Sequence, residues 1–300
     1  MAFGQYVNLD FDQIKTSIKD YLRSNTNFTD YDFEGSNLSI IIDALAYNTY
    51  ITSYNTNMAA NECFLDSSTL RENVVSLARN IGYVPRSRRS SRARISFNIS
   101  EITETVTATV RAGIICNGSA ANTSYIFSIP EDITVPVVDG VAVFDNIEIY
   151  EGTLINQNFT VNTSQFNQRY ILSNSFIDTS TIRVKVKPDE SSSSTVTYQQ
   201  IDNIVGVTST SSSYLLQEIE DERYELIFGD NVIGKKLSND NYITVSYIIT
   251  SGKDGNGASE FSFIGNIIDQ DGATIDASNF SLVTTEESSR DGDEIESISS

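Results

Sequence analysis

The chain of 300 residues carries 40 Asp and Glu against 20 Lys and Arg, a formal net charge of −20, and it contains no histidine and no tryptophan. The absence of histidine excludes Ser-His-Asp and Cys-His catalysis and removes the commonest metal ligand. No apolar run is long enough to cross a membrane, and the surplus of acid disfavours nucleic acid. We therefore expect neither a membrane nor a nucleic acid among the partners.

The negative charge is confined to one part of the chain. Residues 1–94 contain ten basic and ten acidic side chains, whereas residues 95–300 contain the remaining ten bases and thirty acids. The length allows two or three domains. The first residues lack the basic and apolar blocks of a secretion signal, so we expect the protein to be made and assembled in a cytoplasm.

A first helix is predicted to begin after Asp10, because Asp10 and Gln13 have the spacing of a capping box. Its apolar stripe recurs at helical spacing. The stripe consists of Phe11, Ile14, Ile18, Tyr21 and Leu22.

The next predicted helix organises the N-terminal region. It begins after Ser36, a favourable N-cap, and continues to about Asn61. Two apolar stripes lie side by side on it, and a helix with two apolar sides needs two neighbours. We therefore expect partner chains to cover part of it in a helical bundle. The expected contact residues are Leu38, Ile40, Ile42, Ala44, Leu45, Tyr47, Ile51, Tyr54 and Met58.

One amide in this helix, that of Asn57, needs an explanation, because an Asn inside a helix is costly unless it is exposed or bonded. We expect exposure to solvent, and the alternative is a contact that fixes register in a bundle. A third helix is predicted to start at Asp66 to Ser68. Gly82 ends it and Pro85 prevents its resumption. Residues 1–92 thus form a helical assembly region.

Five arginines follow within nine residues: Arg86, Arg88, Arg89, Arg92 and Arg94. A nucleic-acid site would need interleaved aromatic residues or a basic surrounding, and both are lacking. We interpret the segment as a basic collar that docks against carboxylates of the downstream region or of a partner, because guanidinium binds carboxylate bidentately. A solvated linker is the alternative. We assign the five arginines an electrostatic role in partner binding.

From Ala93 the apolar period changes from helical to two, which predicts strands. Asp139-Gly140 lies between two apolar runs and predicts a two-residue hairpin turn. We divide the region into an antiparallel β domain at residues 93–188, a serine-rich linker or long loop at 189–213 and a second β segment at 214–300. The fold class is α+β. Hinges are expected after Gly82 and at residues 189–195.

No residue set indicates chemistry. The glycines at 252–257 do not lie between a strand and a helix, so they indicate a turn rather than a phosphate cradle. Aspartates at 254, 269, 271, 291 and 293 raise the question of calcium, but no complete EF-hand loop is present. Turn chemistry is the better account of them. We assign no catalytic, cofactor-binding or metal-binding residue, and we expect no enzyme activity and no cofactor.

Several ordered motifs resemble those of baseplate wedge subunit six of T-even-like contractile-tailed phages, within the baseplate J-like group. In the helical region they lie at residues 30–36, 46–49, 60–62, 64–67, 70–76 and 82–87. Downstream they lie at residues 151–153, 167–170, 178–184, 228–234, 245–247 and 252–257. A similar stretch to residues 293–300 begins a further domain in the family, so we expect the chain to be a short form or a fragment.

The resemblance implies a structural component of the virion, in the tail baseplate. It implies pairing with a second copy of the chain and with wedge subunit seven through a helical bundle. It also implies contacts with other wedge subunits and with the sheath-proximal subunit, and transmission of the contraction signal. A receptor-binding or fibre-like adhesin is the alternative, although no fixed-period repeat is present. A carboxylate-dependent hydrolase is a third hypothesis, for which no acid–base pair stands out.

Overall fold

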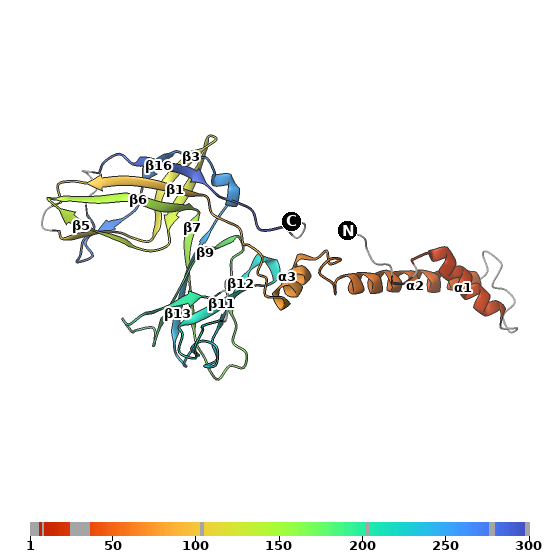
Figure 1. Cartoon of the computed structure of the whole chain (residues 1–300). Coiled ribbons are helices and arrows are strands. Elements are labelled where there is room, and N and C mark those ends of the chain that lie inside the picture. The colour runs from red at the N-terminus through yellow and green to blue at the C-terminus, as the bar shows by residue number, and fades with distance from the viewer. Residues whose placement is uncertain are drawn as a thin grey trace. The chain divides into compact units, whose positions relative to one another are not determined.

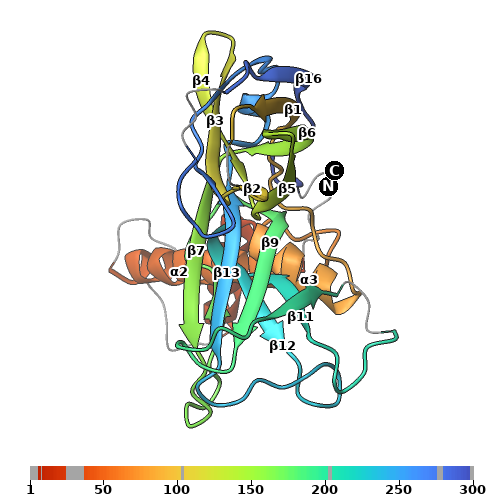
Figure 2. The same cartoon turned by 90° about the vertical axis from the view of Figure 1, so that its left-hand side faces the viewer.

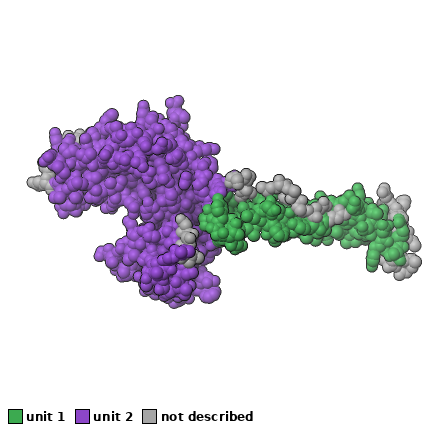
Figure 3. Space-filling model, in the orientation of Figure 1, with its two compact units in different colours: residues 1–84, 299 green, residues 85–298, 300 purple. Residues whose placement is uncertain are grey.

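The computed structural model describes residues 6–7, 9–24, 37–102, 105–201, 205–275 and 280–297. The chain divides into two compact units, residues 1–84 and residues 85–298, which Figure 3 shows in green and purple. The first unit is helical and the second is built from strands (Figure 1). The expected α+β class, with helices ahead of antiparallel sheets, is confirmed.

The described part of the helical unit contains α1 (Phe11–Arg23), α2 (Asn37–Asn61) and α3 (Arg71–Asn80). The cap predicted at Asp10 is confirmed, because its carboxylate accepts a hydrogen bond of 3.1 Å from the amide of Gln13. α1 packs against α2, and an ion pair of 2.5 Å between Lys15 and Asp43 joins them. The cap predicted at Ser36 lies outside the described residues.

The third helix begins later than predicted. α3 begins at Arg71, and the residues from Asp66 to Ser68 belong to the turn that follows α2. The local sequence offers the helix no side-chain cap, because the residue before it is Leu70. The helix ends before Gly82 as predicted. Gly82 has a φ of 81°, in the left-handed region that glycine adopts at low cost.

Nine strands form the first sheet of the second unit. They are β1 (Arg92–Ile99), β2 (Thr107–Val110), β3 (Gly113–Ala120), β4 (Thr123–Ile129), β5 (Ile133–Val138), β6 (Val141–Glu151), β14 (Glu260–Phe263), β15 (Ile267–Ile268) and β16 (Thr284–Arg290). Their order is β14-β3-β4-β6-β5-β2-β15, and β1 pairs with both β6 and β16. The Asp139-Gly140 turn is confirmed: both residues have positive φ between β5 and β6, as a type I′ hairpin requires.

Seven strands form the second sheet. They are β7 (Thr153–Thr160), β8 (Tyr170–Ile171), β9 (Ile177–Lys187), β10 (Val196–Gln200), β11 (Ser213–Glu218), β12 (Tyr224–Phe228) and β13 (Tyr242–Ile249). Their order is β7-β13-β9-β10-β11-β12-β8, and among the described residues of this sheet only β10 and β11 pair in parallel. Figure 2 shows β7, β13 and β9 side by side. Two short 3₁₀ turns, η1 (Glu220–Glu222) and η2 (Gly252–Gly255), follow β11 and β13.

The expected division into residues 93–188, 189–213 and 214–300 is wrong. The first sheet uses residues 92–151 and 260–290, whereas the second uses residues 153–249. The second sheet is therefore inserted between early and late strands of the first, and Gly152 alone separates β6 from β7. Periodicity predicts strands but not their partners, so a boundary drawn from composition misses an insertion.

The linker expected at residues 189–213, with its hinge at 189–195, is also wrong. β10 lies within this range and pairs with β9 before it and with β11 after it. β13 pairs with β9 as well. A rotation about residues 189–195 would break the strand pairing of this sheet. The hinge expected after Gly82 falls at the boundary between the two units and stays a prediction.

Each sheet has a separate apolar core, formed by the alternate residues of its strands. In the first, Phe97 stacks on Phe144 with ring centroids 4.9 Å apart, and Ile95 is fully buried. In the second, Val184 of β9 and Val245 of β13 are fully buried and face each other in register. These cores hold β1, β9 and β13 in place, and the polar contacts between the two sheets lie at the ends of these strands.

Candidate functional site

One face of α2 is already used inside the chain. Its buried residues recur at helical spacing, and most are small or polar, which lets α1 and the N-terminal segment approach closely. They are Ser39, Ile42, Ala46, Ser53, Asn57 and Asn61. This face leaves most of the apolar residues of α2 on other sides of the helix.

We expected the side chain of Asn57 to be exposed, but it is buried. Its side-chain oxygen accepts hydrogen bonds of 2.9 Å from the amides of Tyr6 and Val7, and its Nδ2 donates to the carbonyl of Val7 at 3.0 Å. The carboxamide thus pairs with extended backbone as a neighbouring strand would. Its role is to fasten the N-terminal segment to α2, a contact 50 residues away that local sequence does not indicate.

The first predicted stripe of α2 is largely uncovered. Ile40 is 60% exposed, Tyr47 61%, Ile51 37% and Tyr54 47%. Ala44 is exposed as well, and Met58 is half-buried. Apolar residues of this size, repeated over successive turns of one helix, form a contiguous surface rather than scattered exposure.

The second stripe is divided. Leu45 is 51% exposed, and Ile41, which the stripes did not include, is 54% exposed. Leu38 is half-buried. Ile42 is 1% exposed, so it is removed from the expected partner-binding set: its side chain packs within the chain, on the face that α1 covers. The uncovered surface of α2 therefore consists of Leu38, Ile40, Ile41, Ala44, Leu45, Tyr47, Ile51, Tyr54 and Met58.

The turn between α2 and α3 is built around Glu62. Its carboxylate accepts hydrogen bonds from the hydroxyls of Ser68 at 2.6 Å and Thr69 at 2.7 Å, and from the amide of Asn73 at 2.8 Å. The backbone amides of Thr69 and Leu70 donate at 2.9 and 3.3 Å. Glu62 thereby caps α3 from the end of the preceding helix. Hydrogen bonds, foremost those from Ser68 and Asn73, lower its pKa to about 2.

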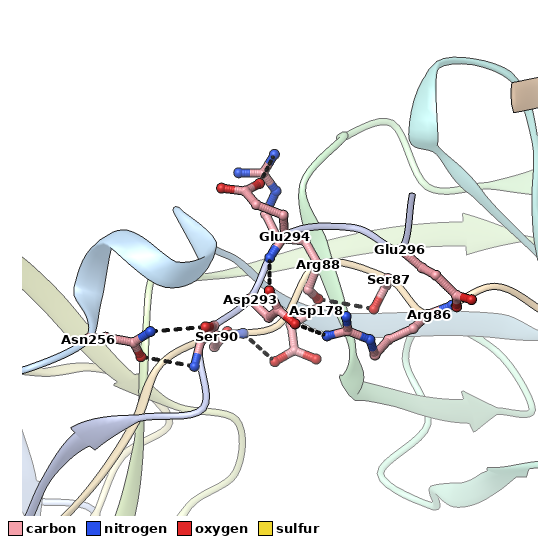
Figure 4. Close-up of polar contacts among 10 residues, drawn as sticks. Arg86, Ser87, Arg88, Ser90, Asp178, Asn256, Asp293, Glu294 and Glu296 are labelled. Carbon is pink, nitrogen blue, oxygen red and sulfur yellow. Dashed lines mark hydrogen bonds and ion pairs between the residues drawn. The ribbon is translucent and has the colours of Figure 1, made fainter. Parts of the chain in front are cut away.

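The beginning of the arginine collar is bound to the carboxylates near the end of the chain (Figure 4). The guanidinium of Arg86 lies 2.7 Å from Asp293, and Arg88 lies 2.9 Å from Glu294. The backbone amide of Arg86 also donates to Glu296 at 2.8 Å. Arg88 further stacks over the ring of Phe176 at 4.5 Å. These contacts correspond to docking on the downstream region, the first of the two readings of the collar.

The remaining arginines differ from one another. Arg92 donates to Ser180 at 3.0 Å and lies over the ring of Tyr150, and Arg94 lies 3.7 Å from Glu287. Arg89 pairs through its backbone with Asp293, and its side chain is exposed. Arg86, Arg88, Arg92 and Arg94 thus have contacts within the chain, and the side chain of Arg89 is exposed. The role of the five arginines in binding a partner stays a prediction.

The glycine-rich segment at residues 252–257 forms a junction between the two sheets. Ser91, at the entry to β1, is fully buried and donates to the carbonyl of Gly252 at 3.0 Å and to Asn256 at 2.9 Å. Asn256 in turn bonds both backbone groups of Gly292. A side chain at Gly255 would collide with Glu151. The glycines therefore permit close packing, and the turn that we expected is confirmed.

Asp178 secures the same junction from the second sheet (Figure 4). It is fully buried and accepts hydrogen bonds from the amide of Ser90 at 2.9 Å and from the amide and hydroxyl of Ser180 at 3.0 and 2.7 Å. Every carboxylate oxygen thus has a donor. Asp178 thus joins the entry to β1 to the beginning of β9.

A cavity of about 430 Å³ lies beside β8 and β12. The carboxylate of Glu225 in its wall accepts two hydrogen bonds from Arg169, at 2.8 and 2.6 Å. This bidentate pair uses both oxygens. The arginine in the wedge-like motif at residues 167–170 is therefore explained by an internal ion pair.

Two general properties complete the description. Among the residues that the structure describes, no three His, Cys, Asp or Glu side chains gather in a way that would hold a metal ion. Within the same residues, no helix has the length and apolar character needed to cross a membrane. Uncovered helical faces next to a rigid turn, on a chain that also carries two sheets, are the features of an assembly component.

The comparisons with known proteins point to the same class. Residues 10–83 match the family model described as baseplate wedge protein gp6-like, helical domain. The chain is also 27% identical over 276 residues to the baseplate wedge protein gp6 of Enterobacteria phage T4, an alignment that covers 86% of this chain and 41% of that protein. The chain thus spans less than half the length of this relative. The resemblance to baseplate wedge subunit six is confirmed.

Proposed function

We propose that the chain is a structural component of a contractile-tail baseplate wedge and that it assembles through the uncovered surface of α2. The proposal rests on one observation: α1 covers one face of α2 while large apolar residues remain exposed on the others. Similarity to wedge proteins supports the structural rather than enzymatic role.

The uncovered residues supply enough apolar surface for a stable contact. Full burial of an Ile or Leu side chain contributes about 1.5–3 kcal/mol, and Ile40, Leu45 and Ile51 are each more than a third exposed. Tyr47 and Tyr54 add aromatic surface with a polar tip, a type of residue that is enriched at interfaces. A partner helix that covers these residues completes the bundle.

The partners follow from the resemblance. We propose a second copy of the chain and wedge subunit seven as the occupants of the bundle, with other wedge subunits and the sheath-proximal subunit as further neighbours. The protein then resides in the tail baseplate of the virion after assembly in the host cytoplasm. In this role the chain passes on the change of shape that starts contraction.

The test is coexpression of the full chain with the other tail proteins, followed by copurification. Ile51→Asp places a charge in the uncovered surface of α2, and it should abolish copurification of the bundle partners while the β unit stays folded. Ser76→Asp is the matched control, because it adds the same charge at an exposed polar residue of α3, whereas residues one turn from Ile51 on α2 share its face. Circular dichroism of each purified variant checks the fold.

The result is decisive in either direction. Loss of the partners with Ile51→Asp and their retention with Ser76→Asp support the proposal. If both variants copurify with the same proteins as the parent chain, α2 is not the assembly surface. Binding of the purified chain to host cells without other tail proteins would instead favour an adhesin.

A further inference from the structure

The outer face of the second sheet differs in charge from the rest of the β unit. β7, β10 and β13 contain no Asp or Glu, and the single acid of β9, Asp178, is buried at the other end of that strand. Residues 95–300 contain thirty acids against ten bases, so four neighbouring strands nearly free of acid are a marked exception. Figure 2 shows β7, β13 and β9 side by side across this sheet.

Three of those ten bases lie on this face. In β9, Ile182, Val184 and Val186 are buried, so the alternate residues Arg183, Lys185 and Lys187 point outward. The strand register sets Lys185 in one row with Asn158, Thr244 and Thr197 of the neighbouring strands. These neighbours are polar but uncharged, so none of them neutralises the charge of Lys185.

The cations on this face are incompletely neutralised. Arg183 lies 3.4 Å from Glu131. Among the described residues, neither Lys185 nor Lys187 forms an ion pair with a carboxylate. Hydrogen bonds from Ser191 and the charge of Lys187 lower the pKa of Asp189, beyond the end of the strand. Lys185 itself is exposed. The face therefore offers positive charge to a neighbour, and the row around Lys185 is polar.

We propose that this outer face of β7, β13, β9 and β10 docks on the acidic β surface of a second copy of this chain. The chain provides both members of the pair, since residues 95–300 carry thirty acids against ten bases and three of those bases lie on this face. Opposite potentials steer association and fix orientation. The contact joins two different surfaces, so it is heterologous and can continue from copy to copy around a ring. It is separate from the apolar surface of α2 and is independent of that proposed contact.

The salt dependence distinguishes this contact from non-specific association and from the apolar contact proposed for α2. Two chains of net charge −20 repel each other, and salt screens that repulsion, so non-specific association rises with salt. The proposed contact has the opposite dependence. Raising ionic strength from about 0.1 M to about 1 M shortens the screening length from about 10 Å to about 3 Å and weakens the contact. Burial of the apolar surface of α2 is not weakened by salt.

The experiment measures association of the full chain with itself, with one copy immobilised and the other in solution, at low and high salt. The test variant is K185E/K187E. The matched control is K235E/K236E, which reverses two adjacent exposed lysines outside this face, one of them beside Asp230 as Lys187 is beside Asp189. Both variants change the net charge equally. A photo-crosslinking residue in place of the exposed Thr197 identifies what the face touches.

The expected result is a salt-sensitive association that K185E/K187E weakens by about tenfold or more, because two attractive contacts become repulsive, while K235E/K236E changes it little. The crosslink at position 197 should join an acid-rich β peptide of a second copy. Equal behaviour of the two variants overturns the proposal. Retained self-association, with loss of binding to single-stranded DNA or to anionic vesicles in K185E/K187E, also overturns it and assigns the face to that ligand.

Discussion

The Nδ2 amide of Asn73 donates a hydrogen bond of 2.8 Å to the carboxylate of Glu62, across the turn that joins α2 to α3. Because Glu62 also receives the backbone amides that precede α3, one side chain holds the end of one helix and the beginning of the next. The turn is therefore a rigid element. Two of its large apolar residues are exposed, Phe64 at 53% and Leu70 at 56%.

Replacement of this carboxylate should destabilise the helical unit. Glu62→Gln keeps the size of the side chain but removes the charge, and hydrogen bonds to charged groups contribute about 1.5–3 kcal/mol. We expect a lower midpoint in urea unfolding followed by far-UV circular dichroism. Glu72→Gln, on an exposed residue of α3, is the control and should leave the midpoint unchanged. Equal midpoints for both variants would show that the hydrogen bonds of Glu62 do not stabilise the helical unit.

The same group predicts a pH dependence. The pKa of Glu62 is lowered from 4.5 to about 2 on folding, so the folded state favours the ionised form. Its contribution is present above pH 4.5 and is lost as the pH falls through that value towards 2. Unfolding free energy of the parent chain should therefore fall more over this range than that of Glu62→Gln. Parallel pH profiles would contradict the assignment.

A third prediction separates two isoleucines that the helical pattern groups together. Ile42 is 1% exposed and Ile40 is 60% exposed. Ile42→Ala should cost about 2–5 kcal/mol of unfolding free energy, because it opens a cavity in the packed face. Ile40→Ala should change stability by less than about 0.5 kcal/mol in the free chain and should weaken partner binding instead. Urea unfolding and copurification measure the two effects. Similar losses of stability would contradict the difference in burial.

The difference between buried and exposed residues of α2 could be predicted from the sequence only in part. Spacing at steps of three and four gives α2 and its apolar stripes, and both are local properties. Which stripe the chain covers itself depends on α1 and on the segment at Tyr6 and Val7, a contact that spans 50 residues. A polar residue such as Asn57 gives no apolar signal of burial. The sequence therefore predicts that α2 has apolar faces, but not which face the chain itself covers and which it leaves exposed.

The β unit shows the same limit. The hairpin at Asp139-Gly140 follows from turn chemistry within four residues, and it was predicted. The return of residues 260–290 to the first sheet depends on pairing between β1 and β16, almost 200 residues apart in sequence. No local pattern carries that information. The arginine collar was correctly read as a segment that meets carboxylates, but whether these belong to the chain or to a partner was decided by the same distant pairing.

A fourth prediction tests this internal docking of the collar. Arg88 is an ion-pair partner of Glu294 and stacks on Phe176, whereas the side chain of Arg89 is exposed. Arg88→Ser should lower the unfolding free energy of the β unit by about 1–3 kcal/mol. Arg89→Ser should leave it within about 0.5 kcal/mol of the parent. Thermal unfolding by circular dichroism compares them. If Arg88→Ser unfolds as the parent does, docking of the collar adds nothing to stability.

The last prediction concerns the residue between the two sheets. Gly152 has a φ of 122°, and its amide donates to the carbonyl of Ile126 at 2.8 Å. A β-carbon at this position would collide with the carbonyl of Ile249 in β13. Glycine is required both by the backbone conformation and by the close approach of that strand. Gly152→Ala should therefore destabilise the β unit by about 2–6 kcal/mol, the sum of backbone strain and overpacking.

Gly113 provides a control with almost the same backbone conformation. Its φ is 125°, and nothing lies within 4 Å of the place that a β-carbon would take. Gly113→Ala thus meets the strain without the collision and should cost about 1–3 kcal/mol. Urea unfolding of both variants isolates the collision as the difference between their free energies. Equal costs would mean that β13 moves aside freely, and that the junction between the two sheets tolerates a wider spacing at Gly152.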